Sequence, residues 1–188
     1  MIESRFHFSP LKIPNSFGIK LEQKTDERGS LTRIWDSNLF LDKFEVNQVS
    51  IVNNPIKYTL RGLHFQKAPF AENKIIYCIN GTVFDVLVDL RAKSKTYLQY
   101  LELEIGPDSE YQGIQIPAGC GHGYLTLNSN STLVYFMDNH FLESSSSGIK
   151  WDDPQLQINW PKYPTLVSVR DSRLPYIRDL ISAANSII

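Results

Sequence analysis

The fold class follows from the stretch "KIIYCINGTVFDVLVDL", residues 74–90. It contains two runs rich in β-branched and aromatic residues, 74–79 and 82–90, with Asn-Gly between them. Asn-Gly between two such runs is a strong turn signal, so the stretch predicts two strands joined by a tight turn. In the second run the even-numbered and odd-numbered side chains point to opposite faces, and we expect one of these faces to be core.

The same pattern continues on both sides of this stretch, from about residue 45 to residue 140. Strand-like runs alternate there with the turn signals "NNP", "GPDS" and "NSNS", and helical periodicity is almost absent. Short strands at this spacing favour an all-β sandwich or barrel. Residues 175–188 instead begin with proline and repeat apolar residues at helical intervals, which predicts a short C-terminal helix lying against the barrel.

The composition excludes several classes of function. A chain of 188 residues suits one domain with its own core, and a net charge of −1 offers no global positive field for nucleic acid. No apolar run is long enough to span a bilayer, and "MIESRFHFSP" lacks the apolar segment of a signal peptide. We therefore expect a cytoplasmic protein without nucleic-acid or membrane partners. For Cys78 and Cys120, reduced thiols are favoured over a single bridge.

Two short motifs indicate a pocket in the barrel. Metal-binding cupin barrels carry G-x5-H-x-H-x3–4-E-x6-G and a second motif containing P-x-G-x2-H. The second is present as "PAGCGH" with His122, but in the first His64 is followed by Gln66 where a histidine ligand would stand. Seven residues before Gly81, at the position of the glutamate ligand, the chain has Lys74, whose charge repels a divalent cation. The sequence predicts a cupin-type pocket in which a fixed cation replaces the metal.

Six blocks extend this pattern along the chain. They are "DERGSL" (26–31), "RGLHFQ" (61–66), "NKIIYCINGTVFDVLVDLR" (73–91), "IPAGCGHGYLTL" (116–127), "GIKWDDPQLQINWP" (148–161) and "SVRD" (168–171). Together they resemble the dTDP-4-dehydrorhamnose 3,5-epimerase family over roughly residues 20–175. The resemblance implies an all-β, cupin-type jelly-roll barrel that uses no metal or cofactor. It also implies an isomerase that inverts C3, or C3 and C5, of a nucleoside-diphosphate 4-keto-6-deoxyhexose, in deoxysugar, O-antigen and lipopolysaccharide synthesis.

The resemblance also implies a domain organisation. The chain is expected to be one epimerase-like cupin domain, 1–188, with a barrel core at 46–140 and C-terminal strands, loops and a helix at 141–188. Residues 1–45 are expected to form strands that contact a second subunit, giving a homodimer. Their apolar side chains are more than a small barrel is expected to bury alone: Phe6, Phe8, Phe17, Leu31 and Trp35.

Four residues correspond to the family's catalytic groups. A proton next to a ketone can be removed if the developing enolate is stabilised, and inversion requires proton delivery on the opposite face. By resemblance His64 is the base and Asp171 orients it. Lys74 places its positive charge near the enolate, and Tyr135 donates the proton from the other side.

Five further residues correspond to substrate-binding positions. Arg28 and Arg61 match arginines that grip the diphosphate, a role that suits guanidinium forks. Gln48 and His122 match pocket residues, and Arg170 matches a lysine near the nucleotide. Simpler roles remain open for some of them: a hydrogen-bonded core residue for His64, a structural role at a turn for His122, core packing with a hydrogen-bonded hydroxyl for Tyr135, and a surface ion pair for Arg28.

The chain also departs from its relatives around the nucleotide. Arg33 and Ser146 stand where glutamates are usual, and Phe136 and Arg170 stand where lysines are usual. These departures predict a nucleotide other than dTDP, with CDP first and GDP second; the alternative is that these loops have drifted and dTDP is retained. Three other functions compete with epimerisation: a 3,4-ketoisomerase of nucleotide sugars, a metal-dependent cupin oxygenase, and a non-catalytic sugar-binding cupin.

Overall fold

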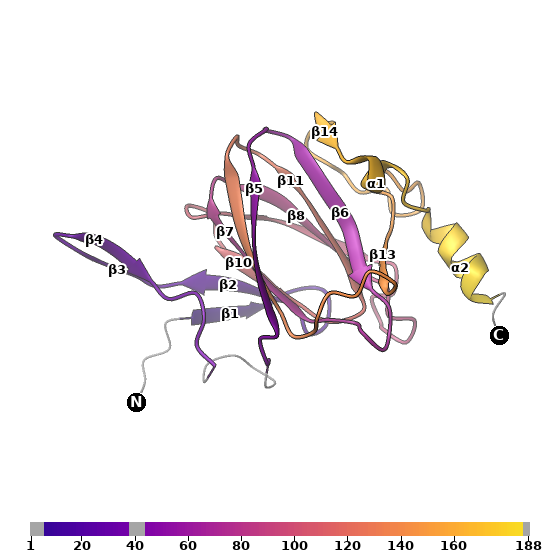
Figure 1. Ribbon diagram of the computed structural model, residues 1–188, viewed down its shortest axis with the longest axis horizontal. Coiled ribbons are helices and arrows are strands. Elements are labelled where there is room, and N and C mark those ends of the chain that lie inside the picture. The colour runs from indigo at the N-terminus through magenta and orange to yellow at the C-terminus, as the bar shows by residue number, and fades with distance from the viewer. Residues whose placement is uncertain (1–5, 38–43, 186–188) are drawn as a thin grey trace.

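The computed structural model describes residues 6–37 and 44–185, and β-strands dominate it (Figure 1). The first sheet has the order β1 (Phe6–Pro10), β2 (Phe17–Leu21), β10 (Gly113–Ile116), β7 (Lys74–Asn80), β12 (Ser131–Met137) and β5 (Gln48–Asn54). The second has the order β13 (Ser146–Gly148), β6 (Thr59–Gln66), β11 (Cys120–Thr126), β8 (Val83–Asp89) and β9 (Tyr100–Ile105), and β14 (Leu166–Val167) pairs with β6. A separate hairpin joins β3 (Gln23–Asp26) to β4 (Gly29–Thr32).

The two large sheets pack face to face around one apolar interior. The first sheet contributes Ile76 and Leu133 to it, and the second contributes Leu87 and Tyr124, all at 1% exposure or less. Strand alternation explains this set, since every second side chain of each strand points inward. The all-β barrel predicted from the sequence is confirmed.

Strand β8 is buried on both faces, so the expectation of one core face was incomplete. Leu87 points into the interior, while Val86 and Val88 pack on the other side against Ile149 and Ile177. The outer face is covered because the C-terminal segment crosses it. That segment ends in the short helices α1 (Val169–Ser172) and α2 (Ile177–Asn185), and α2 confirms the expected C-terminal helix.

The N-terminal segment covers the outer face of the first sheet. Phe6 is buried there, and Trp35 stacks on Phe136 with 5.7 Å between ring centroids. Phe8 and Phe17 are half-buried, and only Leu31 of the five residues discussed above is largely exposed, at 67%. The chain covers most of these groups by folding back on its own sheet but leaves Leu31 exposed, and the expected homodimer stays a prediction.

Two further predictions can be checked at this level. The Asn-Gly turn is confirmed: Gly81 has φ +75, and a β-carbon there would lie 2.5 Å from Ser131 Oγ. Cys78 and Cys120 are both free and buried. Neither helix in the described part of the chain has the length and apolar character needed to cross a bilayer.

Candidate active site

A local irregularity in β6 points two of the predicted site residues the same way. Arg61 and His64 are three residues apart, a spacing that puts side chains on opposite faces of a regular strand. Their partners on β11 are Tyr124 and His122, only two residues apart, because the register shifts between them. Tyr124 lies in the interior core, so Arg61 and His64 both belong to the interior side.

Gly62 makes this irregularity possible. It has φ +118, and a β-carbon on it would lie 2.5 Å from Gly123 Cα. Its backbone N–H donates to Asp171 Oδ2 at 3.1 Å. The Arg-Gly-Leu-His spacing is thus fixed by a backbone that only glycine fits.

His64 and Asp171 form the predicted pair. His64 Nε2 lies 2.7 Å from Asp171 Oδ1, and the imidazole side chain is 34% exposed whereas the carboxylate is 4% exposed. Burial alone would raise the pKa of Asp171, but hydrogen bonds from His64, Gly62 and Ser168 and the His64 charge hold that pKa below its ordinary value. Since the carboxylate can only accept, the imidazole proton lies on Nε2 and the Nδ1 lone pair is free to act as a base.

His122 has a carboxylate partner that sequence reasoning missed. His122 Nε2 lies 2.8 Å from Asp85 Oδ2, and both side chains are buried. The other oxygen, Asp85 Oδ1, is buried without a hydrogen-bond donor among the described residues. The signal was in the sequence, because strand alternation puts the Asp85 carboxylate on the same face as Leu87, which is core.

Tyr135 faces the same interior from the opposite sheet. Its ring centroid lies 6.1 Å from that of His122, and Tyr124 is a close electrostatic neighbour of its hydroxyl. The Tyr124 hydroxyl donates to Asn54 Oδ1 at 3.3 Å, and Arg61 Nε donates to the same oxygen at 2.8 Å. Arg61 is thereby held by Asn54 while the rest of its side chain remains exposed.

Desolvation sets the protonation state of Tyr135. It raises the pKa of the phenol well above its ordinary value, and the neighbouring Tyr124 and Asp85 raise it further. The hydroxyl therefore keeps its proton at physiological pH, as a group that delivers a proton must before the reaction.

Lys74 and Gln48 lie on the first sheet near Tyr135. Lys74 begins β7, is 7% exposed, and has its Nζ 3.1 Å from Glu72 Oε1. Gln48 begins β5 and shares a face with Ser50, the strand partner of Tyr135. Its Oε1 accepts the backbone N–H of Phe141 at 3.1 Å. The carboxylate beside Lys74 was not anticipated from the sequence.

Arg170 lies at the edge of this group and contacts Ser146, another residue that differs from the family pattern. Its Nη2 donates to Ser146 Oγ at 2.7 Å. Ser146 pairs with Gln66 in β13, two residues before the strand partner of His64. These two departures from the family pattern therefore form one contact, next to the His64–Asp171 pair.

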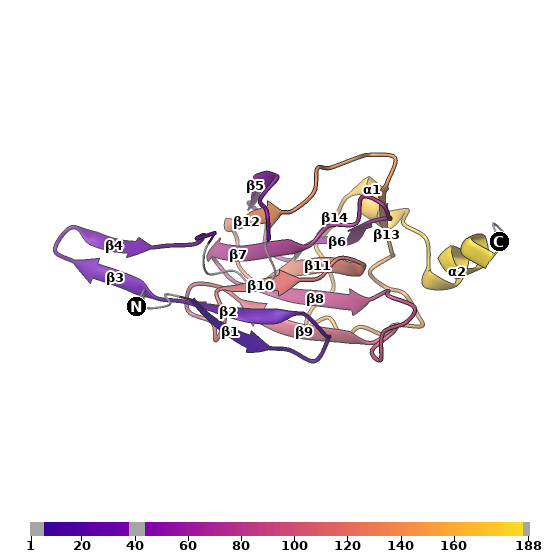
Figure 2. The same ribbon diagram turned by 90° about the horizontal axis from the view of Figure 1, so that it is seen from below.

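Arg28 is not brought to the site. It lies between β3 and β4, at the tip of a hairpin that extends away from the barrel in both views (Figures 1 and 2). Its Nη2 lies 2.6 Å from Asp26 Oδ2, and the side chain is 82% exposed. Within one chain, Arg28 is the surface ion pair that the sequence left open as an alternative.

The two other residues that differ from the family pattern, Phe136 and Arg33, also lie outside the barrel interior. Phe136 follows Tyr135, so it points to the outer face, where it packs under Trp35. Arg33 is exposed and pairs with Asp36 at 2.9 Å.

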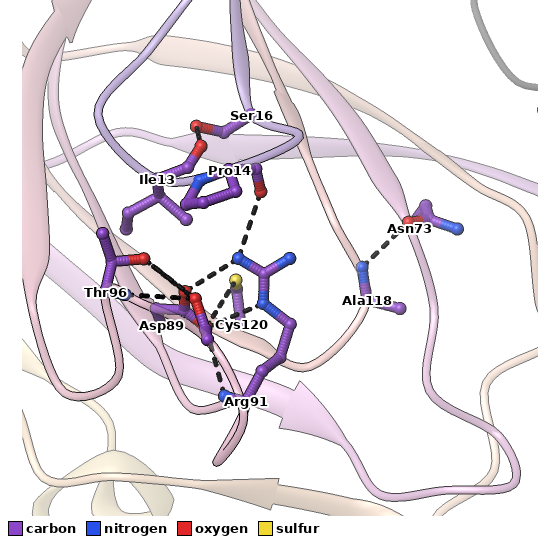
Figure 3. Close-up of polar contacts among 10 residues, drawn as sticks. Ile13, Pro14, Ser16, Asn73, Asp89, Arg91, Thr96, Ala118 and Cys120 are labelled. Carbon is purple, nitrogen blue, oxygen red and sulfur yellow. Dashed lines mark hydrogen bonds and ion pairs between the residues drawn. The ribbon is translucent and has the colours of Figure 1, made fainter.

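A polar network lies where β8 ends and β11 begins (Figure 3). Asp89 ends β8 and accepts from Arg91 Nε at 2.7 Å, Ser94 Oγ at 2.5 Å and Thr96 Oγ1 at 2.6 Å. The Cys120 thiol, which begins β11, lies 4.0 Å from the same carboxylate. In the same view, the backbone N–H of Ala118 donates to the Asn73 side chain at 2.8 Å.

These features define a class of protein: a jelly-roll barrel of the cupin type whose interior carries acid–base groups on both sheets. The family model for dTDP-4-dehydrorhamnose 3,5-epimerase matches residues 10–179, and the chain belongs to this family.

Individual relatives agree with this assignment. The chain is 41% identical over 123 residues to dTDP-4-dehydrorhamnose 3,5-epimerase of Sinorhizobium fredii, covering 65% of this chain and 63% of that protein. It is 32% identical to the Shigella flexneri enzyme, covering 78% and 82%. A crystal structure of the Bacillus anthracis enzyme with TDP and PPi bound superimposes with a TM-score of 0.87 at 28% identity, covering 92% of this chain and 99% of that one. The predicted cupin-type jelly roll is confirmed by this similarity.

Proposed function

We propose that the protein epimerises a nucleoside-diphosphate 4-keto-6-deoxyhexose at C3, or at C3 and C5. The observation that carries this proposal is the placement of two acid–base groups on opposite sheets of one interior. His64, held by Asp171, stands on β6, whereas Tyr135 stands on β12. A sugar ring between them would present one face to a base and the other to a donor, as inversion requires.

The reaction uses groups already present in the interior. His64 Nδ1 removes the proton next to the C4 ketone, and the electron pair of the C–H bond moves into an enolate. The ammonium of Lys74 stabilises the negative charge on the enolate oxygen. Tyr135 then delivers a proton to the opposite face of the carbon, and proton exchange with solvent restores both groups.

Asp171 makes His64 a better base. Its carboxylate stabilises the imidazolium that forms when the proton is taken, and it fixes the ring so that Nδ1 faces the substrate. The lowered pKa of Asp171 keeps it ionised at neutral pH.

We further propose that the nucleotide is dTDP. The expectation of CDP or GDP rested on four departures from the family, of which Phe136 packs on the outer face and Arg33 pairs with Asp36. Only the Ser146–Arg170 contact borders the site within one chain. The Bacillus anthracis relative binds TDP, which supports the simpler assignment.

We propose a homodimer in which Arg28 reaches the site of the partner subunit. Support comes from the β3–β4 hairpin, which holds Arg28 away from its own barrel. Support also comes from exposed apolar side chains on the outer face of the first sheet, where Val49 and Ile51 on the edge strand β5 are 52% and 66% exposed. The remaining Arg61 and Arg170 would contact the diphosphate from within the chain.

The setting of the reaction follows from its product. We propose that the enzyme supplies a deoxysugar for O-antigen or lipopolysaccharide synthesis, as one domain spanning 1–188. A cytoplasmic location is supported by two buried free cysteines, since the cytosol keeps thiols reduced.

An assay on synthetic dTDP-4-keto-6-deoxyglucose tests the function. Product NMR should show inversion at C3, or at C3 and C5, with the ketone still at C4. A ketone moved to C3 would instead identify a ketoisomerase, and turnover only with added metal and O₂ would identify an oxygenase. Binding without exchange or inversion would identify a non-catalytic cupin.

A further inference from the structure

Lys74 is not an isolated cation in the barrel. Its Nζ lies 3.1 Å from Glu72 Oε1, and the two side chains are each 9% exposed. No other ion-pair or hydrogen-bond partner of the Lys74 ammonium is found among residues 6–37 and 44–185. The position of this charge in the interior therefore depends on one carboxylate.

The Glu72 carboxylate is itself held from its other side. Its Oε2 accepts from Gln66 Nε2 at 3.0 Å. Gln66 ends β6, and its Oε1 accepts the backbone N–H of Leu142 at 2.8 Å. Glu72 thus connects the end of β6, the strand that carries His64, to Lys74, the first residue of β7.

The residue between Glu72 and Lys74 is equally fixed. The Asn73 backbone N–H donates to Asp138 Oδ1 at 2.7 Å, and Asn73 Oδ1 accepts from Ala118. With its neighbour anchored on two sides, Glu72 has little freedom to move away. Its carboxylate can therefore hold the ammonium of Lys74 in one position, although the four-carbon stem of a lysine is flexible.

We propose that Glu72 is a positioning residue for the epimerase reaction: it aims the Lys74 ammonium at the enolate oxygen. The proposal rests on the proposed function, which gives Lys74 its role. A lysine without such a partner would lose its orientation, because its four-carbon stem is flexible.

Glu72→Gln removes the charge while preserving size and an oxygen that can accept from Gln66. We expect kcat to fall about tenfold or more, the effect of losing one hydrogen bond to a charged group, with KM little changed. Asp152→Asn is the matched control, because it removes a carboxylate from a partly exposed pair with Lys150. The control should retain the wild-type kcat and KM.

A double variant tests whether Glu72 acts by positioning Lys74 or only by supporting the loop. In Lys74→Met, the added Glu72→Gln change should leave kcat unchanged or raise it, since the ammonium is already gone. A further drop in kcat there, or an unchanged kcat for Glu72→Gln alone, would overturn the proposal while leaving the function intact. Wild-type protein that neither exchanges nor inverts the sugar would overturn the function, and the role of Glu72 with it.

Discussion

One carboxylate, Asp171, holds both the imidazole of His64 and the backbone that aims it. Its Oδ1 lies 2.7 Å from His64 Nε2, and its Oδ2 accepts the N–H of Gly62 at 3.1 Å. The bulge in β6 and the orientation of the base are therefore parts of one arrangement. This coupling explains why a residue from the C-terminal segment completes a site built on barrel strands.

His64→Asn should remove the base without disturbing the fold. We expect kcat to fall about 10²- to 10⁴-fold, the usual contribution of a general base. Affinity for dTDP, measured by calorimetry, and the melting temperature should change little. Turnover close to wild type would show that another group takes the proton.

Asp171→Asn should cost less than His64→Asn. The asparagine oxygen can still accept from Nε2, but it cannot stabilise the imidazolium. Stability gives a second readout. Because the folded pKa of Asp171 is lowered, its contribution is present above the ordinary carboxyl pKa of about 3.9 and is lost as pH falls through the lowered value. Melting temperatures recorded from neutral to acidic pH should show a shallower decline for the variant.

Tyr135→Phe should separate the two halves of the reaction. The base can still remove the proton, so deuterium from solvent should enter the sugar while little inverted product forms. Proton NMR of the recovered sugar reports both events. Equal loss of exchange and inversion would mean that Tyr135 shapes the pocket rather than donating the proton.

Hybrid dimers test whether Arg28 acts across the subunit interface. Mixed Arg28→Ala and His64→Asn subunits should form dimers with one intact site, recovering about a quarter of wild-type activity for random pairing in a two-fold dimer. Arg61→Ala mixed with His64→Asn is the control, because both residues act in their own chain and no site is restored. Absence of recovery in the first mixture, or a monomer by light scattering, would contradict the proposed interface.

The sequence predicted the strands well because alternation and turn signals are local. It could not reveal that His64 and Arg61 share a face, since the register shift depends on the pairing of β6 with β11. The family pattern placed Arg28 near the diphosphate, but only the structure puts it on a hairpin remote from its own barrel. Asp85 went unassigned because its partner His122 lies on another strand. Glu72 went unassigned because a spacing of two residues from Lys74 does not by itself show that the two side chains meet.

The central claim is that this interior removes and returns a proton next to a ketone. The most direct measurement is the proton NMR spectrum of dTDP-4-keto-6-deoxyglucose incubated with the wild-type enzyme in D₂O. We predict loss of the C3 proton signal, with or without that of C5, together with inverted product and no exchange in the His64→Asn control. Unchanged C3 and C5 signals, with the nucleotide sugar shown to be bound, would contradict it.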